Sequence, residues 1–261
     1  MPRSLRTVAY LAPMWSELRP LVRGMGLRRT GLTGCLDAHE GVVGDARVVA
    51  ARTGVGPARG HAAAASVIAA AGPDVVVLVG IAGGLDPDLA IGDLVVPDRV
   101  EDATSGAVTR PIAPPQLTPR GTLLTTDGLL DPTELRTHVE RGLLAADMEA
   151  SGVGAACHEA GVSWSVIRAI SDRMDDGLVD GSTMDMLRPD GTPDLRAVAR
   201  TVLTRPRTVP RLIRLGRDMD LATKVAARCA MDAWTPRSTP PATKDPRTTQ
   251  QTPRMGSPEP S

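Results

Sequence analysis

Acidic side chains stand next to apolar strands at two places in this chain, an arrangement typical of a site rather than of a core. Residues 80–98 (GIAGGLDPDLAIGDLVVPD) follow the apolar run VVVLVG into a turn of small residues, where a ligand can approach the backbone closely. Residues 145–173 contain the acidic turn ADMEA, a helix of small residues, and the apolar strand SVIRAIS, which ends at Asp172. Carboxyl groups at such positions can serve as acids or bases.

Length and composition favour one globular domain. The 261 residues are enough for a three-layer core, and the formal net charge of zero gives no reason to expect nucleic acid as a partner. The sequence lacks a long apolar run and a secretory signal pattern, so we expect a cytoplasmic protein. Cys35, Cys157 and Cys229 are far apart and form no CxxC pair, which predicts buried thiols rather than disulfides or a zinc site.

Apolar strands alternate with Ala-rich helical segments, which predicts an α/β protein. The expected architecture is a three-layer α/β/α fold around a central mixed, mostly parallel twisted sheet. We expect strands at residues 7–11, 46–52, 75–79, 94–96, 122–125 and 164–169, and helices at residues 16–24, 58–71, 151–159 and 194–203.

Three motifs carry a resemblance to a known family: GxAGGL…GDLVVPD, the D/E-M-E-A stretch and R-A-I-S-D. Their order and spacing resemble the nucleoside phosphorylase and nucleosidase superfamily, with the pattern of bacterial methylthioadenosine/S-adenosylhomocysteine nucleosidases, over roughly residues 5 to 200. GIAGGLDP and the arginine-rich LTRPRTVPRLIRLGRD also resemble the hopanoid-associated phosphorylase branch. The resemblance implies a phosphorylase-like fold that releases a purine base from a ribonucleoside.

The resemblance and the composition divide the chain into three parts. We expect a nucleoside phosphorylase-like catalytic domain at residues 1–204, a basic C-terminal helix at 205–233 and a disordered tail at 234–261, where Pro, Thr, Ser and Arg dominate. The basic helix is amphipathic and would be able to lie on an anionic membrane. The favoured interpretation is a terminal helix that packs on the domain and leaves its arginines in solvent.

Cleavage of an N-glycosidic bond suits these acidic residues, because positive charge builds on the sugar and negative charge on the departing base. By its place in AISD, Asp172 resembles the family's general acid, which serves N7 of the purine. Glu149 matches the glutamate that binds the ribose hydroxyls, and Met148 matches the methionine that packs on the sugar. Structural alternatives remain: Asp172 as the cap of a turn, and Glu149 as a carboxylate at a helix N-terminus.

Glu17 in APMWSEL matches the glutamate that activates water in the nucleosidases, and Met14 matches the methionine beside the ribose. Glu17 is informative because hydrolysis needs a base for water, whereas phosphorolysis needs a cationic anion site. The alternative is a solvated acid in the first turn of a helix. Val55 of TGVGP matches an aliphatic residue of the pocket for the 5′ substituent.

Some positions depart from the family pattern. Ile81 stands where the turn that also contains Gly83 usually has Ser or Thr, and the missing hydroxyl weakens the case for phosphorolysis; we assign both residues to substrate binding. Arg52 or Arg59 would still be able to approach an anion. Leu129 occupies the position of the adenine-stacking phenylalanine, and the chain has no Phe.

Trp15 is the candidate for base stacking, with a core or subunit-contact role as the alternative. Residues 101–117 replace a longer aromatic loop of the methylthioadenosine enzymes with small residues and prolines, which indicates a more open 5′ pocket. An adenosyl lipid such as adenosylhopane is therefore a candidate substrate.

The sequence favours an enzyme that hydrolyses a 5′-substituted adenosine-type ribonucleoside, works without metal or organic cofactor, and forms a homodimer. Two alternatives stay open: a phosphate-dependent phosphorylase, and a protein that binds a nucleoside without catalysis. A dinucleotide-binding domain is disfavoured, since Gly54-Val55-Gly56 lacks the later glycine and acid of that motif.

Overall fold

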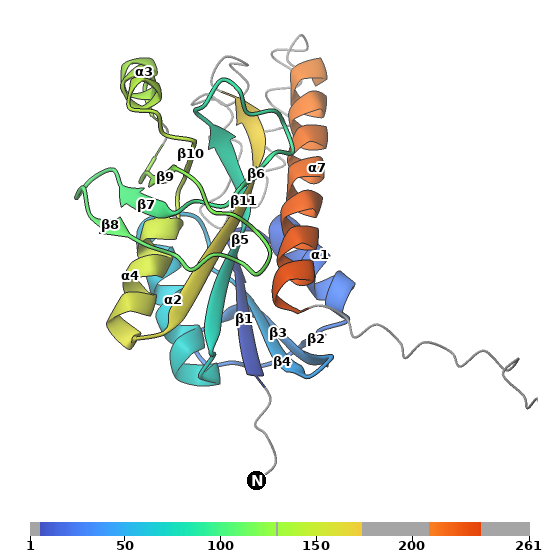
Figure 1. Ribbon diagram of the computed structural model, residues 1–261. Helices are drawn as coiled ribbons and strands as arrows, with labels where there is room; N and C mark the ends of the chain where they lie inside the picture. Colours follow the sequence, from blue (N-terminus) through green and yellow to red (C-terminus); the bar gives the residue numbers. More distant parts are fainter. Residues whose placement is uncertain (1–5, 129, 174–208, 236–261) are drawn as a thin grey trace, which may run out of the picture.

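The computed structural model describes residues 6–128, 130–173 and 209–235, and these form three layers (Figure 1). The predicted helix 194–203, Leu129 and nearly all of the predicted tail lie outside the described residues. The strands are β1 (Arg6–Ala12), β2 (Arg28–Arg29), β3 (Leu36–Val43), β4 (Ala46–Arg52), β5 (Val75–Gly84), β6 (Leu94–Val95), β7 (Arg99–Asp102), β8 (Val108–Thr109), β9 (Thr122–Thr125), β10 (Ala145–Asp147) and β11 (Ser163–Arg173). The helices are α1 (Trp15–Met25), α2 (Pro57–Ala71), α3 (Pro132–Glu140), α4 (Ala150–Ala160) and α7 (Val209–Trp234).

Strand β5 is the centre of the sheet. It pairs in parallel with β1 on one side and along its whole length with β11 on the other, and β1 continues to β4, β3 and β2. At its last residues β5 also pairs antiparallel with β10, which leads to β9, β7 and β8. The long central pairings are parallel and most of the antiparallel ones lie at the edges, which confirms the predicted mixed α/β sheet. Buried on both faces, β5 begins as an unbroken apolar run, as parallel strands do.

Helices cover both faces of this sheet (Figure 1). Residues of α2 and α4 form one hydrophobic core cluster with one face, and residues of α1 and α7 form a second cluster with the other. Small residues let α2 and α4 pack closely, because a Cβ at Gly152 would clash with the carbonyl oxygen of Pro57. A Cβ at Gly60 would lie 2.9 Å from the carbonyl oxygen of Glu149. This close packing brings the N-terminus of α2 next to the turn that precedes α4.

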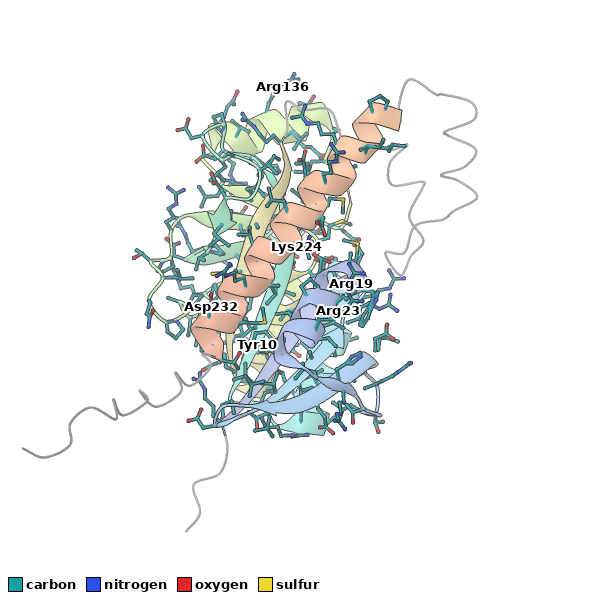
Figure 2. All side chains as sticks on the ribbon, turned by 90° about the vertical axis from the view of Figure 1, so that its right-hand side faces the viewer. Tyr10, Arg19, Arg23, Arg136, Lys224 and Asp232 are labelled. Atoms are coloured by element: carbon teal, nitrogen blue, oxygen red, sulfur yellow. The ribbon has the colours of Figure 1, made fainter. Side chains whose placement is uncertain are left out.

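Helix α7 lies across the sheet beside α1, as Figure 2 shows from that side. Its inner face is narrow and apolar, with buried Ala222, Ala226 and Ala230, and it ends at the buried Trp234. Its outer face carries charge, including the pair of Lys224 with Asp220 at 2.5 Å. The basic helix of the sequence thus packs on the sheet and leaves charged residues in solvent. No helix within the described ranges is long and apolar enough to cross a membrane.

The predicted elements that fall within the described residues are present, with ends shifted by a few residues. Strands β5 and β11 run further than expected, to Gly84 and Arg173, because each pairs with the other beyond its apolar run. The sequence missed α3 and the strands β2, β3, β7, β8 and β10. Four of these strands have only two to four residues, and their pairing rather than their composition defines them. Strand β3 has eight residues, but its sequence LDAHEGVV contains charged residues and a glycine and so forms no apolar run.

Candidate active site

Glu17 is a buried acid, although it sits in the first turn of a helix. Its side chain is in α1 near the carboxyl end of β1, and the residue is only 1% exposed. One carboxylate oxygen accepts a hydrogen bond from the backbone N–H of Met14 at 2.9 Å, and the other accepts one from the N–H of Ile81 at 2.9 Å. Burial raises the pKa of Glu17 to about 7, against the opposing effect of the nearby Arg168 guanidinium. The carboxyl group is therefore poised to exchange a proton near neutral pH.

Glu149 lies between the end of β10 and the first residue of α4. Its carboxylate accepts a hydrogen bond from the N–H of Gly56, at the N-terminus of α2, at 3.2 Å. The other oxygen accepts one from Nη2 of Arg168 at 3.0 Å. Burial raises the pKa of Glu149 to about 8, Arg168 lowers it, and the negative charges of Asp147 and Glu17 add to the rise. A helix N-terminus thus contacts this carboxylate, but the helix is α2 rather than α4.

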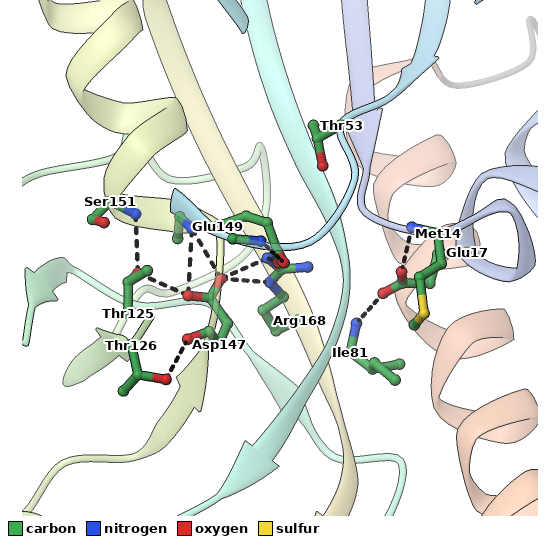
Figure 3. A network of polar contacts seen from close by, with 12 residues as sticks. Met14, Glu17, Thr53, Ile81, Thr125, Thr126, Asp147, Glu149, Ser151 and Arg168 are labelled. Carbon is green, nitrogen blue, oxygen red and sulfur yellow. Dashed lines mark hydrogen bonds and ion pairs between the residues drawn. The ribbon is translucent and has the colours of Figure 1, made fainter. Parts of the chain in front are cut away.

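Arg168 lies at the centre of the site, in β11, with no exposed surface (Figure 3). Asp147 and Glu149 approach its Nε and Nη2 edge, while Nη1 has no hydrogen-bond partner among the described residues. A Cβ at Gly80 would clash with both Nη1 of Arg168 and Oε1 of Glu17, so these two atoms converge on the same small space above β5. Only glycine leaves this space open.

A β-bulge positions Asp172. Strands β5 and β11 pair regularly up to Ile170 and Ala82, and the next pair is Asp172 with Gly83, so Ser171 is the extra residue. The Ser171 hydroxyl donates a hydrogen bond to Asp172 at 2.6 Å. The carboxylate of Asp172 lies 3.3 Å from the position of a Cβ on Gly83, at the half-buried rim of the sheet.

The structure brings most of the predicted residues to this edge of the sheet. Met14 and Ile81 contact Glu17 through their backbone N–H groups, and Gly83 lies against Asp172. Val55 directly precedes Gly56, and Met148 directly precedes Glu149; both are half-buried. Trp15 points elsewhere: it stacks on His39 with ring centroids 5.5 Å apart and is 39% exposed.

Sequence reasoning missed Arg168, Asp147 and Gly80 as members of the site. Arg168 carried a usable signal, since a charged residue in the middle of SVIRAIS must be paired once that strand is buried. Asp147 carried none of its own, because its importance comes from lying beside Arg168 across the strands. Gly80 looked like one glycine of several in its turn.

Comparison with known proteins assigns the family. The family model described as the phosphorylase superfamily matches residues 8–120 and 114–204. The chain belongs to this superfamily. Among curated superfamily members, the 5′-methylthioadenosine/S-adenosylhomocysteine nucleosidase of Mycobacterium bovis is 31% identical, with 54% of this chain and 72% of the relative covered. That of Tolumonas auensis is 26% identical, with 63% and 84% covered.

Solved structures share the superfamily fold. The 5′-methylthioadenosine nucleosidase of Arabidopsis thaliana in apo form has a TM-score of 0.68 at 18% identity, covering 88% of this chain and 95% of that chain. The 5′-methylthioadenosine/S-adenosylhomocysteine nucleosidase of Helicobacter pylori has a TM-score of 0.66 at 17% identity, covering 88% and 98%. The futalosine hydrolase of the same organism has a TM-score of 0.65 at 17% identity, covering 88% and 97%. At these identities the likeness establishes the fold.

Proposed function

We propose that the protein is a nucleosidase that hydrolyses the N-glycosidic bond of a 5′-substituted, adenosine-type ribonucleoside and releases the base. The observation that carries this proposal is the convergence of Glu17 and Arg168 on one space beside Glu149. A base with a pKa of about 7 next to a free guanidinium N–H is suited to hold and deprotonate a water molecule. The curated nucleosidases that resemble the chain support the same activity.

The carboxyl groups of Glu17 and Asp172 lie at different positions along β5. Gly80 marks the Glu17 end and Gly83 marks the Asp172 end, and three residues of extended strand span about 10 Å. This separation suits a ribonucleoside whose sugar lies near Glu149 and whose base lies near Asp172. In this scheme Glu17 activates water, Glu149 holds the ribose hydroxyls, and Asp172 protonates the departing purine. The negative charges around the sugar stabilise the cationic transition state.

Charge favours water over phosphate as the nucleophile. Three buried carboxyl groups, those of Glu17, Asp147 and Glu149, surround the single guanidinium of Arg168. Such a pocket offers no net positive charge to a phosphate dianion. Arg52 pairs with Asp37 at 2.9 Å, and Nη1 of Arg59 donates to the backbone carbonyl of Val55 at 3.0 Å, so both arginines already have partners within the protein.

The finer choice of substrate is adenosylhopane, cleaved in hopanoid synthesis at a membrane surface. Ile213 and Leu221 are 51% and 50% exposed on α7, which also carries several arginines, and the combination suits contact with an anionic bilayer. The small residues of 101–117 suit a bulky 5′ substituent. A cytoplasmic homodimer completes this proposal.

The test is release of adenine from methylthioadenosine, S-adenosylhomocysteine and adenosylhopane in vesicles, each with and without phosphate. The Asp172→Asn protein serves as the blank. We expect release without phosphate, and a preference for adenosylhopane. Release only with phosphate, together with ribose 1-phosphate formation, would make the protein a phosphorylase. No release from any substrate would favour a nucleoside-binding protein without catalysis, and untouched adenosylhopane would remove the lipid proposal alone.

A further inference from the structure

Asp147 is a buried carboxylate to which the proposed chemistry gives no direct part. It lies at the end of β10 and is 6% exposed. One oxygen accepts a hydrogen bond from the hydroxyl of Thr125 at 2.7 Å, and the backbone N–H of Ala150 approaches both oxygens at 3.2 and 3.3 Å. The other oxygen accepts from Nε of Arg168 at 3.0 Å and from Nη2 at 2.5 Å.

These contacts determine which way the guanidinium of Arg168 faces. A guanidinium is planar, so a carboxylate that holds Nε and Nη2 also fixes the position of Nη1. In this structure Nη1 is the buried donor without a hydrogen-bond partner among the described residues, and it points to the space shared with Oε1 of Glu17. Asp147 is therefore bonded to one edge of Arg168, and the opposite edge is presented to the site (Figure 3).

A chain of hydrogen bonds holds Asp147 itself in place. Thr125, which donates to Asp147, accepts from the backbone N–H of Ser151 at 2.9 Å. The Ser151 hydroxyl donates to Asp102 at 2.7 Å, and Asp102 also accepts from the N–H groups of Thr104 and Ser105. These hydrogen bonds connect Asp147 to β7, β9 and the start of α4, so these three elements set the orientation of the Asp147 carboxylate.

We propose that Asp147 is a positioning residue that aims Nη1 of Arg168 at the water held by Glu17; this rests on the function proposed above. Without the Asp147 charge, Arg168 would turn its two-donor edge toward Glu149, which already accepts a hydrogen bond from Nη2 at 3.0 Å. Nη1 would then leave the space above Gly80, and Glu149 would be less available to ribose hydroxyls. Misplacement of a group by about 1 Å lowers a rate by about a hundredfold.

The experiment compares Asp147→Asn with Asp37→Asn, using adenine release by the full chain. Asp147→Asn removes the charge that holds Arg168 at nearly constant volume. Asp37→Asn makes the same exchange in β3, at a carboxylate that pairs with Nε of Arg52 at 2.9 Å. We expect kcat to fall about a hundredfold in Asp147→Asn, with a smaller change in KM, which identifies an interaction of the transition state. Asp37→Asn should keep a kcat within about threefold of the natural protein per folded molecule.

A double-mutant cycle separates positioning from general stability. If Asp147 acts through Arg168, the loss caused by Asp147→Asn should disappear on an Arg168→Met background. If Asp147→Asn fails to fold, Asp147→Ser provides the test, because it also removes the charge, and it should lower kcat with little change in KM. Asp147→Glu keeps the charge and should retain a kcat within about tenfold of the natural protein.

Equal kcat values for Asp147→Asn and Asp37→Asn, or losses that simply add to those of Arg168→Met, would overturn the positioning role while leaving an active nucleosidase. An Asp147→Glu variant as slow as Asp147→Asn would do the same, because the charge would then not be what matters. A natural protein that releases no base would instead overturn the proposed function, and the positioning role with it.

Discussion

The carboxyl group of Glu17 has a pKa of about 7 because burial disfavours its charge more than Arg168 and two N–H groups favour it. Water activation needs the ionised form. We therefore expect kcat/KM for adenine release to fall as the pH drops below about 7, and to rise toward a plateau above it. Measured pH profiles check this expectation, and a rate that is flat from pH 5 to 8 would contradict it.

Replacing the same side chain tests its role directly. Glu17→Gln should lower kcat by about a hundredfold or more, since it removes the proposed base. Glu134→Gln is the matched control: Glu134 also accepts from a helix-start N–H, that of Asp131 at 2.9 Å, but it is exposed and lies in α3. Similar losses in the two variants would show that the helix cap, and not the buried base, is what matters.

Gly80 is expected to be indispensable because of the space above it. A methyl group there would clash with both Glu17 and Arg168, so Gly80→Ala should reduce activity by about a hundredfold by displacing them. Gly41→Ala, in β3, would only press on the end of the Leu27 side chain at 3.0 Å and should remain active. Steady-state rates normalised to folded protein decide the matter; near-natural activity in Gly80→Ala would contradict the geometry.

At the residue scale, the sequence predicted the acids and missed their partners, for a physical reason. Glu17, Glu149 and Asp172 stand in motifs whose spacing can be recognised along the chain. Arg168 and Asp147 meet because β10 and β11 both pair with β5, and the sequence of neither strand predicts this pairing. The two residues that the sequence missed are therefore brought together by the register of the strands.

At the scale of elements, the contact between α2 and α4 depends on backbone approaching backbone. Gly152→Ala should destabilise the protein by about 3 kcal/mol or more, because its methyl group would meet the carbonyl of Pro57 and backbone cannot move aside cheaply. Gly216→Ala makes the same exchange in α7, where nothing lies within 4 Å of the new methyl group. It should stabilise the protein by about 0.5–1 kcal/mol. Urea unfolding of both variants measures whether each substitution lowers or raises the free energy of unfolding.

The strength of the local sequence signal explains which elements could be predicted. Long apolar strands and the Ala-rich helices have local signals strong enough to be recognised, as for β4 and α2. Strand β7, of sequence RVED, and strand β10, of sequence AAD, have none. Pairing makes them strands: β7 pairs with β8 and β9, and β10 pairs with β5 and β9. The missed elements are those whose stability comes from their neighbours.

At the scale of the whole molecule, the two raised pKa values predict how stability depends on pH. Glu17 and Glu149 hold protons in the folded state up to about 7 and about 8, whereas in the unfolded chain each titrates near 4.5. The folded state thus binds more protons between these limits, so the free energy of unfolding should fall as pH rises from 5 to 8. Glu17 alone accounts for about 3 kcal/mol. Between pH 5 and pH 8 the urea midpoint of unfolding should fall less in Glu17→Gln than in the natural protein. An equal fall in the two proteins would exclude Glu17 as the cause.

The branched sheet has a consequence for how the protein acquires activity. Glu17 is near the start of the chain, Arg168 is beyond its middle, and both meet at β5, whose two pairings with β10 and β11 close long loops. Closing such loops costs entropy before any contact compensates, so we expect these pairings to form late in folding. A ribosome that has not yet released the segment of β11 carries a chain with Glu17 and without Arg168 beside it. If the proposed site is correct, activity should therefore begin only when β11 is inserted beside β5.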